Sequence, residues 1–143
     1  MTQNHLPMRF EAMMTGDELI KQFEDGTTPP GNFHHADHVR LAFEYLDRYP
    51  ALEALEKFSA ALKRFAAARG KPQLYHETVT WAYLLLIRER MARAGRSETW
   101  EEFAERNPDL LIWTGGVLGT LYRQETLDSD FARHTFVLPD QGR

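Results

Sequence analysis

Histidines are concentrated in one short segment of this chain, and imidazole is well suited to metal binding and to proton transfer near neutral pH. The segment reads NFHHADH and covers residues 32–38. It holds three of the six histidines, which are His34, His35 and His38. A fourth, His76, is followed directly by Glu77 in the sequence YHET. We therefore expect metal binding or proton transfer at these two segments.

A metal site built from histidines is the first possibility. The chain has no cysteine, so thiolate ligands, a cysteine nucleophile and disulfides are excluded. Imidazole and carboxylate ligands together suit zinc, iron or manganese in the divalent state. We therefore predict a divalent metal (Fe, Zn or Mn) held by His35, His38 and His76.

Two other interpretations stay open. In the first, these residues form a pocket that contains no metal, and His76 and Glu77 serve as catalytic acid and base. In the second, His35 and His76 are hydrogen-bonded core residues, whereas His34 and His38 lie on the surface of a first helical turn. Neither an H-E-x-x-H motif nor the E-x-x-H pairs of di-iron bundles occurs in the chain, so the spacing alone does not decide between them.

The elements that must position these residues are helices. Helical periodicity dominates the sequence, and no alternating strand pattern of useful length occurs. A length of 143 residues with 43% hydrophobic content suits one domain with a continuous core. We predict an all-α, single-domain helical bundle over residues 1–143, with about five to seven helices and the extended C-terminal tail TFVLPD.

Capping signals set the expected helix boundaries. Thr15 and Glu18 form a capping-box pattern, as do Thr99 and Glu102. Asn32 is a suitable N-cap for the second helix. The expected helices are one from Gly16 to about Gly26, one from Asn32 to Tyr49, one from Pro50 to Gly70, one from Leu74 to Ala94, a short one after Thr99, one starting at Asn107-Pro108-Asp109 and ending at Gly115-Gly116, and a short one over residues 128–133.

The turn of about 100° per residue gives the direction of each side chain in the second helix. His35 points into the apolar face and His38 lies at its edge. Four polar residues fall on the opposite side, where solvent is expected: Asp37, Arg40, Glu44 and Asp47. In the fourth helix, His76 shares a stripe with Tyr83 and Ile87.

Short connections favour antiparallel neighbours, so the second and fourth helices should begin at the same end of the bundle. His35 and His76 would then lie in one pocket. Several aromatic residues could line that pocket or could be ordinary core: Tyr75, Trp81, Tyr83, Trp113 and Tyr122. Arg133 and His134 could close over it as an anion clamp or lie in solvent.

The charge and hydropathy patterns restrict location and partners. A net charge of -4 and a pI of about 5.9 argue against a broad nucleic-acid-binding surface. The longest apolar run, VTWAYLLLI, is 9 residues, which is too short to span a bilayer. The first residues do not have the pattern of a secretory signal. We expect a soluble, cytoplasmic protein that binds a small molecule and neither nucleic acid nor membrane.

Three motifs resemble those of a group of small, uncharacterised bacterial all-helical proteins that share F-x-H-x-D-H and Y-H-E-T. The motifs are FHHADHVRLAFEYL, YHETVTW and SDFARHTFVLPD, and the likeness runs from the second helix to the tail. The resemblance brings no activity, cofactor or substrate. It implies that eight residues belong to one site: Phe33, His35, His38, Tyr75, His76, Glu77, Thr78 and Arg133.

These patterns together predict an enzyme that acts on a small organic molecule at the His35/His38/His76 site. The enzyme is metal-dependent if these histidines bind the predicted divalent metal. His76 and Glu77 would supply acid–base catalysis. The predicted substrate-binding residues are Phe33, Tyr75, Tyr83 and Arg133. The alternative is a non-catalytic module that binds a small molecule or a protein partner.

Overall fold

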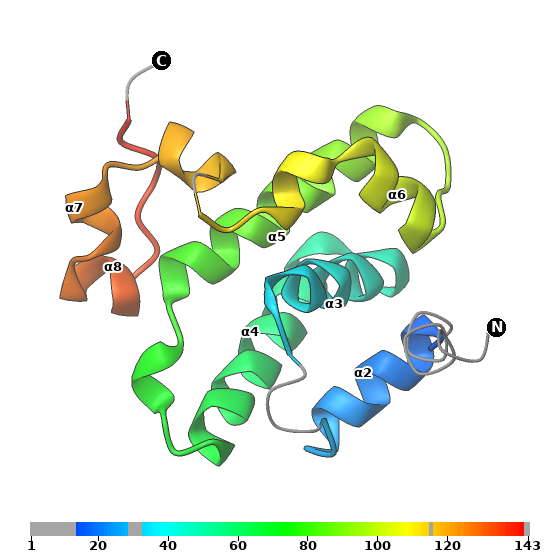
Figure 1. Cartoon of the computed structure of the whole chain (residues 1–143), viewed down its shortest axis with the longest axis horizontal. Helices are drawn as coiled ribbons and strands as arrows, with labels where there is room; N and C mark the ends of the chain where they lie inside the picture. Colours follow the sequence, from blue (N-terminus) through cyan, green and yellow to red (C-terminus); the bar gives the residue numbers. More distant parts are fainter. Residues whose placement is uncertain (1–13, 29–32, 115, 142–143) are drawn as a thin grey trace, which may run out of the picture.

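The computed structural model describes residues 14–28, 33–114 and 116–141, and no strand occurs in these ranges. Their seven α-helices are α2 (Gly16–Glu24), α3 (His35–Arg48), α4 (Ala51–Ala68), α5 (Glu77–Ala94), α6 (Trp100–Arg106), α7 (Gln124–Leu127) and α8 (Asp130–His134). Three short 3-10 helices are η2 (Pro72–Leu74), η3 (Pro108–Leu111) and η4 (Val117–Thr120). The predicted all-α fold is confirmed (Figure 1).

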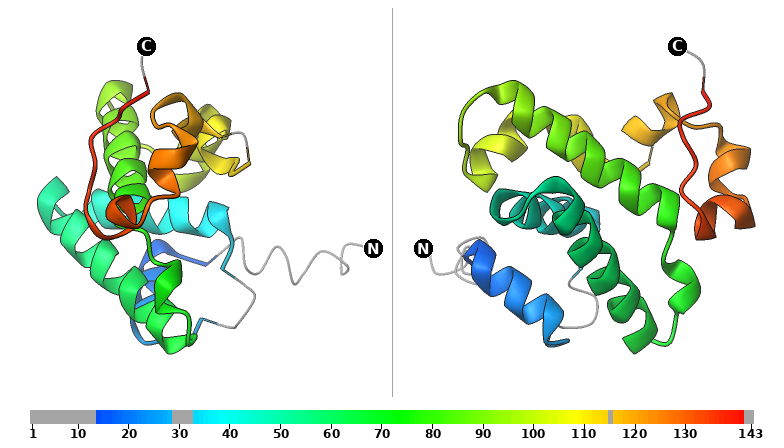
Figure 2. Two further views of the ribbon diagram at one scale, coloured as in Figure 1. Left: turned by 90° about the vertical axis from the view of Figure 1, so that its left-hand side faces the viewer. Right: turned by 180° about the vertical axis from the view of Figure 1, so that it is seen from behind.

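Helix α5 is the central element of the fold. It packs against α3 and α4, and its N-terminal end packs against α8 (Figure 1). The two views in Figure 2 show α2 on the far side of α3 and α4 from α5. Residues of α5 belong to two hydrophobic clusters, since Leu84 and Ile87 pack with α3 and α4, whereas Ala82 and Tyr83 pack with Leu118. The fourth predicted helix is therefore the central one.

Capping residues fix where several helices begin. The capping boxes of Thr15 with Glu18 and of Thr99 with Glu102 are both present, as predicted. The predicted N-cap Asn32 lies outside the described residues. Helix α3 instead has His34 at its N-cap, and the backbone N–H of His34 donates to the Asp37 carboxylate at 2.9 Å.

Two predicted helices differ from the observed ones. The fourth was expected to begin at Leu74, but α5 begins at Glu77, because residues 72–74 form the 3-10 helix η2. The sixth was expected to run to Gly115-Gly116, of which residue 115 lies outside the described ranges. It is the four-residue 3-10 helix η3, and the Asn107 side chain donates back to the Phe103 carbonyl at 2.8 Å.

Part of the polar face of α3 is covered by α2: Glu44 is buried, which corrects the expectation that it faces solvent, whereas Asp47 is exposed as expected. The Glu44 side chain is only 7% exposed and lies 3.2 Å from Arg40 Nε and 2.8 Å from Arg48 Nη1. Arg48 also pairs with Asp17 of α2 at 2.8 Å. A Cβ atom on Gly16 would overlap the Glu44 carboxylate. The charged groups neutralise one another, so this face can be covered without leaving an unpaired buried charge.

No helix in the described ranges combines the length and the apolar composition that a membrane span requires.

Candidate functional site

His35 is held in one orientation by a backbone carbonyl from a distant part of the chain. Its Nε2 lies 2.9 Å from the carbonyl oxygen of Leu110. A carbonyl oxygen only accepts hydrogen bonds, so Nε2 must carry the proton and donate it. In the neutral imidazole, Nδ1 then has a free lone pair, and no hydrogen bond from another described residue to Nδ1 is found. His35 therefore presents a basic nitrogen of fixed tautomer.

Two aromatic side chains complete this site. The ring of His35 lies 4.9 Å from that of Tyr83 in an edge-on arrangement and 5.3 Å from that of Trp113. Tyr83 and Trp113 are 6.3 Å apart, measured between ring centroids. We call these three side chains the ring site. It combines residues from α3, α5 and the segment that follows η3.

The hydroxyl of Tyr83 is the most unusual group in the ring site. Tyr83 is only 6% exposed, and within the described ranges its hydroxyl has no hydrogen-bond partner. A buried polar atom without a partner costs about 1–3 kcal/mol, and native proteins contain few of them. Trp113 beside it is 56% exposed. The ring site therefore combines a buried donor that has no partner in the described ranges with an aromatic side chain that is more than half exposed.

An ion pair on α5 positions the segment that supplies the carbonyl. Arg90 donates to both carboxylate oxygens of Asp109, at 2.8 and 3.1 Å, and to the side-chain oxygen of Asn107 at 2.7 Å. Leu110, the next residue, is completely buried. A bidentate arginine–carboxylate contact has a well-defined geometry. It holds η3 against α5 so that the Leu110 carbonyl faces His35.

Burial keeps both titratable groups of the ring site uncharged near neutral pH. It lowers the pKa of His35, and the hydrogen bond to the Leu110 carbonyl opposes this effect only in part. Burial, together with the nearby charge of Asp109, raises the pKa of Tyr83 to about 12. A neutral imidazole and a protonated phenol can exchange hydrogen bonds or a proton with a ligand.

His38 lies next to His35 but belongs to an aromatic cluster. Its ring is 4.3 Å from that of Phe33, which also contacts Phe23 at 4.6 Å and Phe65 at 5.0 Å. Burial, with a smaller contribution from His35, lowers the pKa of His38 to about 4. The structure thus brings together three predicted site residues, Phe33, His35 and His38, and packs the half-buried His38 against Phe33.

His76 has a structural role in the observed fold. Its Nδ1 accepts a hydrogen bond from the backbone N–H of Val79 at 3.2 Å, which caps the start of α5. Its Nε2 donates to the carbonyl of Leu127 at 2.8 Å. Both ring nitrogens are engaged, so neither is free in this structure for metal binding or proton transfer.

Substitution of His76 should therefore affect stability in a way that depends on capping. We expect His76→Ala to lower the free energy of unfolding by about 1–3 kcal/mol, because it loses the cap and the bond to Leu127. His76→Asn should lose clearly less, because asparagine can accept from Val79. Urea denaturation of both variants measures this difference, and equal losses would contradict the capping role.

The other predicted residues lie around the start of α5. The Tyr75 hydroxyl donates to Glu77 Oε1 at 2.6 Å, and Lys63 lies 5.2 Å from the Tyr75 ring centroid. Arg133 donates to the carbonyl of Gln73 at 2.7 Å, and its charge is close enough to His76 to help lower the pKa of His76, after burial. Glu77 is thus paired with Tyr75, and Arg133 lies beside His76. The exposed His134 binds the Asp130 carbonyl of its own helix.

The expected meeting of His35 and His76 is not found, because α3 meets α5 further along its length. His35 contacts Tyr83, which is seven residues, or about 10 Å, beyond His76 on a helix. In the described part of the chain, no group of three or more His, Asp or Glu side chains is placed to hold a metal ion.

Two parts of the ring site carry little signal in the amino-acid sequence. Trp113 was one of several aromatic candidates. Its high solvent exposure, which sets it apart from the other candidates, is a property of the folded chain. The Leu110 carbonyl has no sequence signal, since every residue has a backbone oxygen. Comparison of the chain with family models, curated proteins and solved structures gave no match.

Proposed function

We propose that the chain binds a small organic molecule at the ring site. The observation that carries this proposal is the buried hydroxyl of Tyr83, which has no hydrogen-bond partner in the described ranges and belongs to a ring 4.9 Å from that of His35, whose tautomer is fixed. A ligand with a hydrogen-bonding group would pair the Tyr83 hydroxyl and remove the cost of leaving it unpaired.

The neighbouring side chains indicate what kind of molecule fits. The Nδ1 atom of His35 accepts a hydrogen bond, and the Tyr83 hydroxyl can donate one. Trp113 offers an exposed aromatic face on which a planar group can stack. Since Trp113 is more than half exposed, its side chain can rotate to admit a ligand with little loss of buried area. We infer a planar or aromatic ligand that carries an amide or hydroxyl group.

Tyr83→Phe tests this proposal because it removes only the hydroxyl. We expect benzamide, as a probe, to bind the unmodified chain and to bind the variant about tenfold more weakly, because one hydrogen bond contributes about 1–1.5 kcal/mol. Toluene has no hydrogen-bonding group and should show no such difference. Thermal-shift or calorimetric titration measures both ligands. Equal benzamide affinity for the two chains would exclude the role of Tyr83.

A catalytic function at the same site is the second candidate, and the fixed tautomer of His35 favours it. The Leu110 carbonyl orients the imidazole, and the lowered pKa keeps Nδ1 unprotonated near neutral pH. Such a nitrogen is suited to remove a proton from a bound O–H or N–H group. In this version the enzyme uses His35 as its base, and acid–base catalysis by His76 and Glu77 stays a separate hypothesis.

The divalent metal predicted from the sequence stays a separate hypothesis, which in this structure rests on His35 and His38. These residues are one helical turn apart on α3. Elemental analysis of protein purified without a polyhistidine tag, before and after incubation with zinc, iron or manganese, tests it directly.

A further inference from the structure

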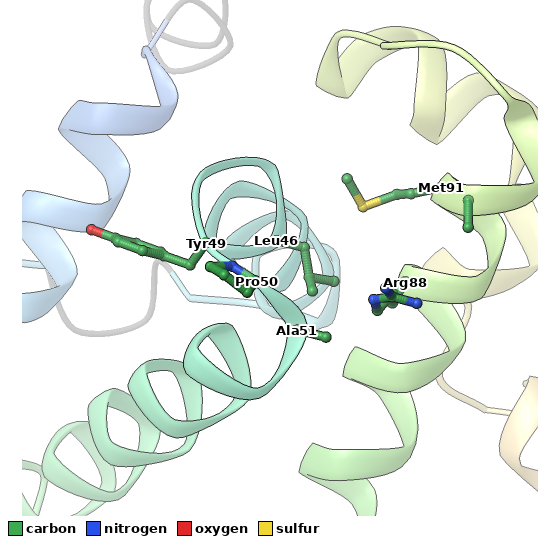
Figure 3. Close-up of a pocket in the computed structure, with 7 residues that line it drawn as sticks. Leu46, Tyr49, Pro50, Ala51, Arg88 and Met91 are labelled. Carbon is green, nitrogen blue, oxygen red and sulfur yellow. The ribbon is translucent and has the colours of Figure 1, made fainter.

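A groove of about 290 Å³ lies between the C-terminal half of α5 and the junction of α3 with α4 (Figure 3). Its volume is close to the lower limit of roughly 300 Å³ for small-molecule sites. It shares no residue with the ring site. The side chains that line it include Leu46, Tyr49, Pro50 and Ala51 on one side and Arg88 and Met91 on the other.

Arg88 supplies the positive charge in this largely apolar groove. In the described ranges, no carboxylate oxygen lies within 4.0 Å of its guanidinium. Its neighbours one helical turn away are all apolar, namely Leu84, Leu85, Met91 and Ala92. Two other arginines of α5 are paired, since Arg90 contacts Asp109 at 2.8 Å and Arg93 contacts Glu89 at 2.7 Å. Unlike these two arginines, Arg88 has no carboxylate partner in the described ranges.

The surroundings of the groove add further positive charge. The ammonium group of Lys57 lies 4.7 Å from the ring centroid of Tyr49, which lines the groove. The first residue of α4, Ala51, lies in the wall, and the start of a helix carries partial positive charge. Glu53 lies 4.0 Å from Lys57 and partly offsets its charge. Asp47 does not line this groove. It lines a second pocket, together with Phe43 and Arg96.

We propose that this groove binds a small carboxylate with an apolar body. Arginine recognises a carboxylate through two parallel hydrogen bonds, which a lysine or a neutral side chain cannot reproduce. The body of the ligand would lie against Leu46 and Met91, whose flexible thioether adapts to different shapes. Charge complementarity thus selects the carboxylate, and the apolar lining selects the body.

Hexanoate is a suitable probe, and hexanamide has the same shape without the charge. We expect hexanoate to bind with shifts in the NMR signals of Leu46 and Met91, and to bind at least tenfold more tightly than hexanamide. Arg88→Gln should weaken hexanoate binding at least tenfold and leave hexanamide binding unchanged. Arg93→Gln on the same helix is the matched control and should leave both affinities unchanged.

No binding of hexanoate at millimolar concentration would overturn the proposal. Equal affinity of hexanoate for the unmodified chain and Arg88→Gln would do the same, as would NMR shifts confined to residues away from the groove. Loss of binding in Arg93→Gln as well would also overturn it, because that outcome indicates a general effect of net charge. Tyr83→Phe should bind hexanoate normally, so a failure of the ring site and a failure of this groove are distinguishable.

Discussion

Replacing Glu44 with alanine is expected to destabilise the chain by about 3 kcal/mol, because it leaves two arginines without their shared buried carboxylate. Glu44 contacts Arg40 at 3.2 Å and Arg48 at 2.8 Å, and the side chains of these arginines are 13% and 27% exposed. Arg40 also donates to the Met14 carbonyl at 2.7 Å. Loss of Glu44 would weaken the contact between α2 and α3 as well as the charge balance.

The matched control for Glu44→Ala is Glu89→Ala. Glu89 also pairs with an arginine four residues away, Arg93, at 2.7 Å, but the two side chains are 54% and 74% exposed. Exposed pairs of this kind contribute about 0–1 kcal/mol. Urea denaturation should show a clearly larger loss for Glu44→Ala. Equal losses for the two variants would show that burial adds nothing to the Glu44 pairs.

Acidification is expected to weaken the fold through His38. Its pKa is about 4 in the folded chain, against an ordinary value of 6.5. The unfolded chain binds this proton more readily, so stability is complete above about pH 6.5 and falls as the pH drops towards 4. The full difference corresponds to roughly 3 kcal/mol. Lowered pKa values of His35 and His76 act in the same direction.

His38→Phe isolates this effect, because phenylalanine keeps an aromatic ring next to Phe33 and cannot titrate. Carboxylates titrate alike in both chains, so the difference in unfolding free energy between them reports His38. We expect this difference to change by roughly 3 kcal/mol between pH 7 and pH 4, with the unmodified chain losing more. His134→Gln is the control, since the His134 side chain is 68% exposed. A constant difference across the range would contradict a buried, neutral His38.

Local signals in the sequence predicted much of the helical framework. The starts of α2 and α6 follow from Thr15 and Thr99, because each capping box forms within four residues of sequence. The start of α5 was misplaced, because its cap is His76, and histidine is not among the preferred N-cap residues. The side chain of His76, which was predicted to be functional, also completes the start of this helix.

Non-local packing accounts for what the sequence did not reveal. Periodicity correctly placed His35 and Tyr83 on inward faces of separate helices, and the two rings meet. It assigned Glu44 to solvent, because a polar stripe gives no sign that another helix will cover it with matching charges. The position of His35 along α5 depends on how α3 and α5 cross, which periodicity and capping patterns do not specify.

The imidazole nitrogens of His35 provide the most direct test of the ring site. Nitrogen-15 NMR at pH 7, with benzamide added, reports both the tautomer and contact with the ligand. Our interpretation predicts a proton on Nε2 and none on Nδ1, and benzamide should shift the Nδ1 signal together with the indole N–H signal of Trp113. A proton on Nδ1 in the free chain, or benzamide binding that leaves both signals unchanged, would contradict it.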